Sequence, residues 1–502
     1  MKFETLRNGL ANFMGGVLPA LVTLFTTPFI VNALGDSSYG VLTLITAIVG
    51  YFAFLDLNVT ASSVKYVAEH HATGDVLRRN QTLTSGIALY LIIGLAGCGL
   101  VLLFTDTLLD RVFAIPANLR SEAGQALALA AFGFLFGQLQ IYLNSVPQSI
   151  RRYDQSALLE SIFGVITPLA TVLTLWLGYG LVEIVAVRVL ISIVNNVVLV
   201  GVVHRLLPDF ALVKPDRQTL VVLGKFSGFA YLSRLATVAY AQGDKLILGA
   251  LTSMSALTHY AVPFMLVNRV FALSYRLGGV LFPVASALAA NREIERLREL
   301  YLYAARYVFF INVSLTLMLT TLAHEILLYW IGPSLAASGA AVLVLIAFAS
   351  LIDSLTNAPS LVNDGLGQPH ITGSFAVSRA GLGVALTLLL VHELGMIGAA
   401  WAQLVTSALM AVLFLTYVHG RSVPVSLRDY SCVVVAPSLP VLAIAMGLVF
   451  MRLGSPPLSM TQTFLVLMSQ VLVLGVYAMA FIFRRTDRLA LLARLRIPRH
   501  GV

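Results

Sequence analysis

The chain has 502 residues, of which 58% are hydrophobic and only 11% are charged, and its mean hydropathy is +0.89. These values exclude a soluble globular fold and predict an all-α polytopic membrane protein. The net charge of +9 calls for no nucleic acid partner, because cytoplasmic loops of membrane proteins are rich in Lys and Arg that contact anionic lipid headgroups. Cys98 and Cys432 both fall in apolar segments, so neither a disulfide nor a metal site is predicted.

Along the chain, about 14 apolar segments are each long enough to cross a bilayer as a helix. Lys2 and Arg7 precede the first segment, which is longer than the apolar region of a signal peptide and is therefore expected to be retained. The predicted spans centre on residues 8–34, 39–63, 81–104, 121–148, 156–177, 181–203, 222–250, 259–286, 305–331, 338–361, 371–391, 395–418, 431–451 and 461–483.

Lysine and arginine are distributed unevenly between the connecting loops. An even number of spans places both termini on one side, and the loops on that side hold 23 of the 32 Lys and Arg residues. The loops on the other side hold three, and six lie within spans. The positive-inside rule therefore predicts that both termini are cytoplasmic.

Two basic segments have the pattern of amphipathic helices on a membrane surface. Residues 290–307 and the tail from Arg484 to Arg499 interleave basic with apolar side chains, which favours contact with the inner leaflet. A solvated connecting helix without a role at the lipid surface is the alternative for both.

Short motifs recur at an offset of about 210 to 220 residues, the mark of an internal repeat. Residues 33–41 resemble residues 250–262, and residues 143–147 resemble residues 355–359. This offset maps six spans onto six in the same orientation, which predicts two lobes related by a pseudo-two-fold axis along the membrane normal. The predicted domains are an N-lobe with helices 1–6, a C-lobe with helices 7–12, and helices 13–14 with a basic amphipathic tail: residues 1–210, 211–420 and 421–502.

The stretch 225–290 carries charges at membrane depth: Arg234, Asp244, Lys245, Arg269 and Arg276. Each arginine at a bilayer centre costs roughly 2.5 to 3.5 kcal/mol on insertion scales. Seven residues separate Arg269 from Arg276 and eleven separate Arg234 from Lys245, so each pair returns to nearly one face of its helix. These side chains are therefore expected to line a wet cavity.

The alternative is that these cations hold helices together by pairing with acids. Asp56, Asp244 and Asp353 lie within spans and could serve as partners. The positive charges outnumber the acids at matching depth, which favours the cavity interpretation for the set.

Several segments carry a resemblance to a known family. Leu34-Gly35-Asp36-Ser37-Ser38-Tyr39-Gly40 with Phe54-Leu55-Asp56-Leu57-Asn58, and Gly243-Asp244-Lys245-Leu246-Ile247-Leu248-Gly249 with Tyr260-Ala261-Val262 and Leu281-Phe282-Pro283, stand in corresponding hairpins. They resemble the hairpins of polysaccharide transporters, the Wzx-type flippases of the multidrug/oligosaccharidyl-lipid/polysaccharide (MOP) superfamily. The similarity extends over nearly the whole chain, with Asn58 standing where the family usually has glycine.

The resemblance implies a V-shaped bundle of two lobes that works by alternating access. Its cargo would be an undecaprenyl-pyrophosphate-linked oligosaccharide, the repeat unit of an O-antigen, capsule or exopolysaccharide, moved from the cytoplasmic to the periplasmic leaflet of the bacterial inner membrane. A pyrophosphate needs several cations in a low-dielectric site, and arginine offers planar, bidentate donors that stay charged. The candidate binding residues are Arg234, Arg269, Arg276 and Arg379, with Lys245 and Arg188 nearer the outer face.

Asp56 and Asp244 are candidates for ion coupling, because an acid inside a membrane span is a functional hypothesis by default. Each could bind Na⁺ or H⁺, or serve as counter-charge to the cations of the empty cavity; for Asp244 a static pair with its neighbour Lys245 is a further alternative. No cofactor is expected. The expected partners are the lipid-linked oligosaccharide, membrane lipids, and a glycan polymerase with export machinery, around a monomer.

No enzymatic motif is found. His324-Glu325 and His392-Glu393 begin like zinc-binding helix motifs, but Leu328 and Met396 occupy the position of the second histidine. The long outer domain of a glycan polymerase or ligase is also missing between the predicted spans. The alternative function is a multidrug or metabolite exporter of the same superfamily, although a surplus of arginines would repel cationic drugs.

Overall fold

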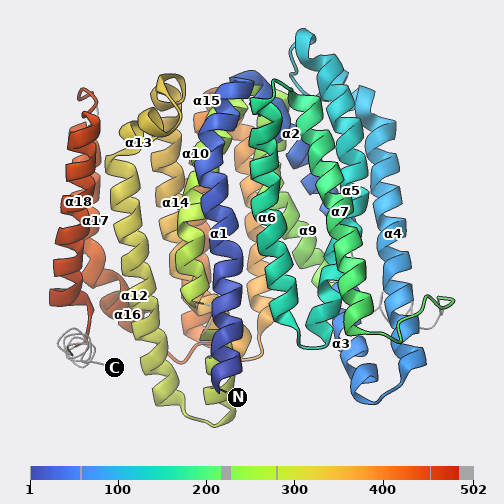
Figure 1. The fold of residues 1–502 in the computed structure, drawn as a ribbon. Coiled ribbons are helices and arrows are strands. Elements are labelled where there is room, and N and C mark those ends of the chain that lie inside the picture. Colours follow the sequence, from blue (N-terminus) through green and yellow to red (C-terminus); the bar gives the residue numbers. More distant parts are fainter. Residues whose placement is uncertain (1, 57–58, 216–227, 279–280, 453, 485–502) are drawn as a thin grey trace, which may run out of the picture. The chain divides into compact units, whose positions relative to one another are not determined.

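The computed structural model describes residues 2–56, 59–215, 228–278, 281–452 and 454–484; within these ranges the side chains of residues 2–15, 228–234, 273 and 276–278 are outside the description. The described chain is helical throughout and contains 11 helices long and apolar enough to cross a membrane (Figure 1). The prediction of an all-α polytopic membrane protein is therefore confirmed.

The chain divides into two compact units. Unit 1 comprises residues 1–261 and 376–399, and unit 2 comprises residues 262–375 and 400–502. The predicted tail beyond Arg484 lies outside the described residues.

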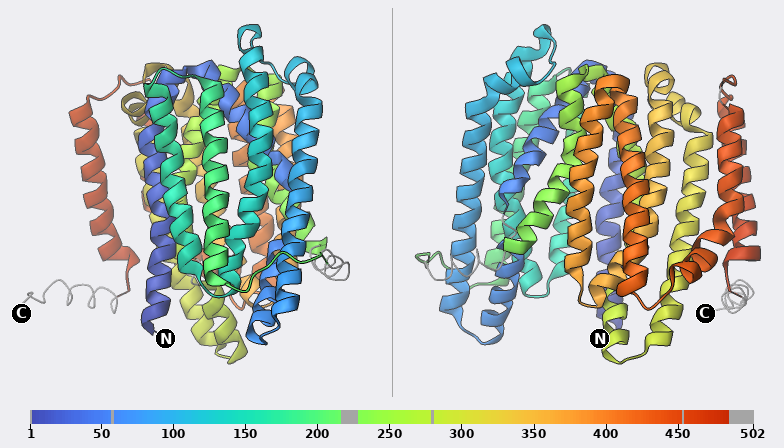
Figure 2. Two further views of the ribbon diagram at one scale, coloured as in Figure 1. Left: turned by 45° about the vertical axis from the view of Figure 1, so that its right-hand side comes forward. Right: turned by 180° about the vertical axis from the view of Figure 1, so that it is seen from behind.

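Unit 1 is a bundle of long apolar helices. Helix α5 packs between α4 and α7, α1 packs along α6, and α2 packs on α9 (Figures 1 and 2). Fully buried Tyr90 and Tyr142 stack in its core, with ring centroids 5.2 Å apart. Its helices are α1 (Lys2–Leu34), α2 (Asp36–Tyr51), α3 (Val59–Ala72), α4 (Val76–Thr107), α5 (Arg120–Ser149), α6 (Tyr153–Trp176), α7 (Leu181–Leu206), α9 (Gly228–Leu251), the first turns of α10 (Met254–Gly278) and part of α15 (Pro369–Arg421).

The second predicted span is not one helix. Helix α2 is followed by a short 3-10 turn, Phe52–Leu55, and Asp56 has extended backbone with φ −71° and ψ 106°. Helix α3 then begins at Val59. The predicted continuous helix over 39–63 was wrong here because the sequence pattern did not reveal that the Asp56 side chain is held at the break. Asn58 lies outside the described residues.

Unit 2 packs around a core of aromatic and aliphatic side chains that includes Tyr301, Phe309, Val313 and Tyr430. Helix α12 packs on α14 and α17, and α13 packs on α14. Its further helices are α11 (Leu281–Ala290), α12 (Ile294–Thr321), α13 (Ala323–Trp330), α14 (Pro333–Gly365), α16 (Leu427–Tyr430), α17 (Leu439–Arg452) and α18 (Met460–Tyr477).

Most of the predicted surface helix over residues 290–307 belongs to the first turns of α12, which begins at Ile294. Leu297 and Tyr301 are each 1% exposed and belong to the core of unit 2. Part of the apolar face therefore packs against protein, whereas Ile294 and Leu300 of the same face are 42% and 37% exposed. Contact of these exposed side chains with lipid or with water stays a prediction.

Helix α15 contains the eleventh and twelfth predicted spans. At Gly395 the backbone takes φ 58° and ψ −137°, a conformation that glycine adopts more readily than other residues. A Cβ on Gly398 would lie 2.0 Å from the carbonyl oxygen of Leu390, eight residues earlier, so the chain folds back here. The predicted break between spans 371–391 and 395–418 is confirmed.

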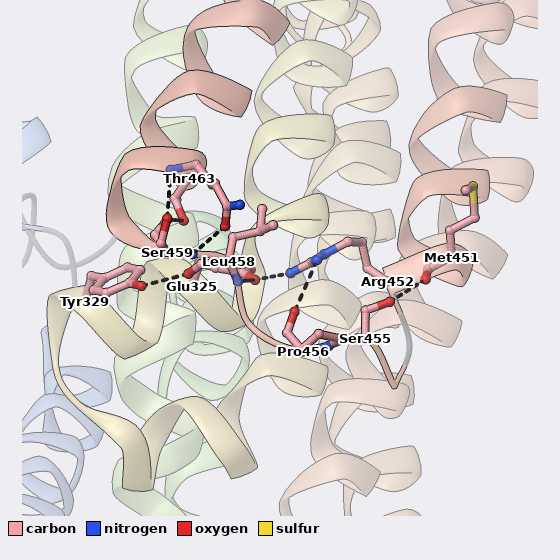
Figure 3. Close-up of polar contacts among 10 residues, drawn as sticks. Glu325, Tyr329, Met451, Arg452, Ser455, Pro456, Leu458, Ser459 and Thr463 are labelled. Carbon is pink, nitrogen blue, oxygen red and sulfur yellow. Dashed lines mark hydrogen bonds and ion pairs between the residues drawn. The ribbon is translucent and has the colours of Figure 1, made fainter.

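A buried ion pair joins α13 to the connection between α17 and α18 (Figure 3). The guanidinium of Arg452 donates to Oε1 of Glu325, whose side chain is 1% exposed, and the amide of Leu458 donates to the same oxygen at 3.1 Å. The Tyr329 hydroxyl donates to the carbonyl of Leu458 at 2.7 Å. The His324-Glu325 sequence thus supplies a structural anchor for the last two helices.

Candidate functional site

Asp56 lies at the break between α2 and α3. Its side chain is 4% exposed, and the hydroxyl of Tyr90 on α4 donates a 2.7 Å hydrogen bond to Oδ1. Tyr142 on α5 stacks on Tyr90, and its hydroxyl lies 2.8 Å from Oγ of Ser63 on α3. Side chains of α3, α4 and α5 thus form a chain of contacts that ends at the buried Asp56 carboxylate.

Asp244 on α9 has a similar tyrosine partner and a second, basic one. Tyr260 on α10 donates a 2.7 Å hydrogen bond to Oδ2, and Nζ of Lys245 lies 3.0 Å from Oδ1. Lys245 also donates to the carbonyl of Ala241 at 2.9 Å. Asp244 and Lys245 therefore form an ion pair, and Lys245 is not an open cation on this helix.

The two acids lie in hairpins that are joined directly. A Cβ on Gly40 of α2 would lie 2.0 Å from the carbonyl oxygen of Met254, where α10 begins. The Thr258 hydroxyl donates to the carbonyl of Asp36 at 2.6 Å, and Nε2 of His259 lies 3.0 Å from a carboxylate oxygen of Asp36. The absence of a side chain at Gly40 permits this close packing.

Arg379 on α15 contacts the same helix as the Asp244 pair. Its guanidinium lies over the ring of Tyr240, 4.6 Å from the centroid, and Nη2 donates to the Tyr240 hydroxyl at 2.6 Å. Tyr240 and Asp244 are four residues apart and so share one face of α9. The structure thus brings Arg379, Tyr240, Asp244 and Lys245 to one helix of unit 1.

Of the other predicted cations, the structure describes the side chains of Arg188 and Arg269. Arg188 on α7 is half-buried, and its Nε donates a long 3.4 Å hydrogen bond to Oγ1 of Thr171. Arg269 on α10 belongs to unit 2 and is exposed. The side chains of Arg234 and Arg276 lie outside the described residues, although their backbones are in α9 and α10.

Arg269 differs from the other described candidates because it has no ion pair or hydrogen bond with any part of the chain that the structure describes. It lies about 22 Å along the helix axis from Met254. A charged side chain within a predicted membrane span requires water or an anion.

A polar pocket of unit 1 was missed by the sequence analysis. It has a volume of about 480 Å³ and is lined by residues of α3, α5 and α6 that include Gln140, Asn144, Gln148 and Glu160. Nδ2 of Asn144 donates to Oε1 of Glu160 at 2.7 Å. The amides recur every fourth residue of an apolar segment, a pattern that places them on one helix face and could have revealed the pocket.

Within the described ranges, no group of three or more His, Cys, Asp and Glu side chains is arranged to hold a metal ion.

A family model described as a polysaccharide biosynthesis protein matches residues 5–289. A probable flippase, AglR, of Haloferax volcanii is 21% identical over 405 residues, 80% of this chain and 80% of that protein. A putative O-antigen transporter of Shigella flexneri is 20% identical over 416 residues, 81% of this chain and 96% of that protein.

Two solved structures share the fold. The lipid II flippase MurJ in an inward closed conformation has a TM-score of 0.68 at 14% identity, covering 94% of this chain and 98% of that one. An inward-facing multidrug transporter of the MATE family and MOP superfamily has a TM-score of 0.63 at 17% identity, covering 80% of this chain and 94% of that one. At such identities these likenesses establish the fold and carry no statement about cargo.

Proposed function

This chain belongs to the polysaccharide biosynthesis protein family, and from that premise we propose that it is a flippase for a polyprenyl-pyrophosphate-linked oligosaccharide. The cargo would be an undecaprenyl-linked repeat unit of an O-antigen, capsule or exopolysaccharide, moved from the cytoplasmic to the periplasmic leaflet of a bacterial inner membrane. The flippase and O-antigen transporter among its relatives support this class of cargo.

The observation that carries the proposal is the exposed guanidinium of Arg269 on α10, which has no ion pair or hydrogen bond among the residues that the structure describes. A pyrophosphate provides an anion that such a group can bind through two parallel hydrogen bonds. Arg379, held on Tyr240, is a second candidate anion ligand. The proposed set of anion ligands also includes Arg188, Arg234 and Arg276. Lys245 is proposed to contribute indirectly, by neutralising Asp244.

The proposed architecture is two six-helix lobes, residues 1–210 and 211–420, followed by two further helices in residues 421–502. The positive-inside bias supports cytoplasmic termini in this arrangement. Alternating access between the lobes would expose the arginines first to the cytoplasm and then to the periplasm.

Asp56 is the proposed coupling residue, binding H⁺ or Na⁺. Its burial and the hydrogen bond that it accepts from the Tyr90 hydroxyl support this role, since a buried carboxylate with an oxygen neighbour is a group that can bind a cation. Asp244 is proposed to balance the positive charge of a neighbouring cation instead, because it forms an ion pair with Lys245.

The test is the position of lipid-linked repeat units in cells that lack the protein. Deletion is expected to leave the glycan at the cytoplasmic leaflet, inaccessible to a periplasmic glycan-modifying enzyme. Wild type is expected to restore access, and Arg269→Ala to leave it blocked although the protein reaches the membrane. Arg78→Ala, a change at an exposed arginine on α4, serves as the matched control and should restore access fully.

Normal glycan exposure in the deletion strain contradicts the proposal. If that strain is instead sensitised to cationic dyes, the exporter function replaces it. If Arg269→Ala restores access to the glycan fully, the proposed cationic site is contradicted, whereas the flippase function is not.

A further inference from the structure

The polar pocket of unit 1 has the features of a carbohydrate subsite. We propose that it binds an uncharged sugar residue of the cargo through vicinal hydroxyl groups. This inference rests on the proposed flippase function and adds to it the chemical class of one sugar and the residues that select it.

The pocket lies within membrane-spanning helices yet has a polar lining. Gln140, Asn144 and Gln148 follow one face of the last turns of α5, Glu160 stands in the second turn of α6, and Thr60 lies at the start of α3. Amide and carboxylate groups in contact with hydrocarbon would be left without hydrogen-bond partners. The pocket is therefore open to water, from which a soluble headgroup can enter.

One lining group has an unused acceptor. The amide nitrogen of Asn144 donates to Glu160, which fixes the orientation of the amide, whereas its Oδ1 is buried and accepts no hydrogen bond within the described structure. The Asn144 backbone carbonyl is occupied separately, by the Ser156 hydroxyl at 2.8 Å. Oδ1 is thus a prepared acceptor for a hydroxyl donor on a ligand.

The donor and acceptor set fits a sugar rather than a phosphate. Glu160 offers carboxylate oxygens that accept from adjacent hydroxyls, and the amides of Gln140 and Gln148 both donate and accept. Ile141, Ala61 and Val64 supply apolar surface for the C–H face of a pyranose ring. The volume of about 480 Å³ falls within the range of roughly 300–1,000 Å³ typical of small-molecule pockets.

The charge of the lining selects among sugars. Among the described residues, nine line the pocket; they include the exposed Glu160 and no Lys, Arg or His. A uronic or sialic acid would place a second carboxylate beside Glu160 without a cation between them, which is unfavourable. The pocket is therefore selective for a neutral sugar.

Direct binding tests this site independently of transport. The purified full-length protein in lipid nanodiscs is mixed with methyl glycosides of glucose, galactose, mannose, rhamnose and N-acetylglucosamine, and with glucuronic acid. Saturation-transfer NMR is expected to detect at least one neutral glycoside and not the acid. Asn144→Ala and Gln148→Ala are each expected to weaken binding about tenfold through loss of hydrogen bonds.

Two further variants serve as a control for the binding measurement and as a test of the role of charge. Gln125→Ala changes an exposed amide at the other end of α5 and should leave binding unchanged. Glu160→Gln removes the charge but keeps a polar group of the same shape, and is expected to admit glucuronic acid.

Failure of every neutral glycoside to bind wild type overturns the proposal, as does unchanged binding in both Asn144→Ala and Gln148→Ala. Flipping of a polyprenyl-linked glycan, measured in the same preparation, separates these outcomes from a failure of the flippase assignment. A flippase that moves glycan but binds no glycoside would retain its function and lose this subsite.

Discussion

The hydroxyl of Tyr90 donates a 2.7 Å hydrogen bond to the buried carboxylate of Asp56 at the break in the second span. Tyr260 makes an equivalent 2.7 Å bond to Asp244. Asp244 also has Nζ of Lys245 3.0 Å from its Oδ1. The same pairing of a buried acid with a tyrosine hydroxyl therefore occurs in both hairpins.

Asp56→Asn is expected to abolish the dependence of glycan flipping on a proton or sodium gradient. The amide keeps the side-chain shape and a hydrogen-bond acceptor for Tyr90, but cannot carry the charge that binds a cation. Flipping measured in proteoliposomes with each gradient imposed in turn checks this. Asp244→Asn is the comparison, and equal gradient dependence in Asp56→Asn and wild type would contradict the coupling role.

Arg379→Ala is expected to reduce glycan flipping at least tenfold, because it removes a planar cation held on an aromatic ring. Arg379→Lys should recover little of the loss, since an ammonium cannot bind a phosphate through two parallel hydrogen bonds. Tyr240→Phe keeps the ring and loses only the hydroxyl acceptor, so its effect should be smaller. An Arg379→Lys variant with wild-type flipping would show that charge alone is needed.

Glu325→Ala is expected to destabilise the protein by about 3 to 5 kcal/mol, because it removes one partner of a buried ion pair. The Leu458 amide loses its acceptor, and the Arg452 guanidinium keeps only a long 3.4 Å hydrogen bond to the carbonyl of Pro456. Thermal unfolding in nanodiscs measures the loss.

The double variant Glu325→Leu with Arg452→Leu is the informative control for this pair. Replacing both charges leaves no buried charge alone, so it should be less destabilised than Glu325→Ala. A double variant that is less stable than Glu325→Ala would contradict this account.

Gly40→Ala is expected to prevent stable folding, since the new Cβ would lie 2.0 Å from the carbonyl oxygen of Met254. Backbone cannot yield as a flexible side chain does, and the two hairpins would have to separate. Gly137→Ala is the matched control, because no heavy atom lies within 4 Å of the added Cβ in α5. Folded yield after purification compares them, and similar yields would contradict the tight contact.

Hydropathy predicted the main helices well, since α4, α6 and α7 match their predicted spans to within about five residues at each end. Apolar length is a local property, so no tertiary information was needed there. The break at Asp56 was missed because its partner Tyr90 lies on another helix. The burial of Leu297 and Tyr301 within residues 290–307 was not predicted, because an apolar stripe does not reveal whether protein or lipid covers it.

The candidate site could be predicted only as a collection of residue types. Arginines at membrane depth were evident from the sequence, whereas the contact between Arg379 and Tyr240 joins residues 139 positions apart. The pocket around Asn144 could have been predicted from the sequence, because its three amides repeat every fourth residue. It was not predicted, because a neutral amide in an apolar segment is a weaker sign of a binding site than a charged side chain.

The fold-back at Gly395 also limits where a reporter can be attached. Because a side chain at Gly398 would meet the backbone of Leu390, a cysteine or epitope placed in this turn would disturb the fold whose topology it was meant to report. Tyr179, in the turn between α6 and α7, is 55% exposed. A single cysteine there is the better probe for deciding by impermeant labelling which side of the membrane these turns occupy.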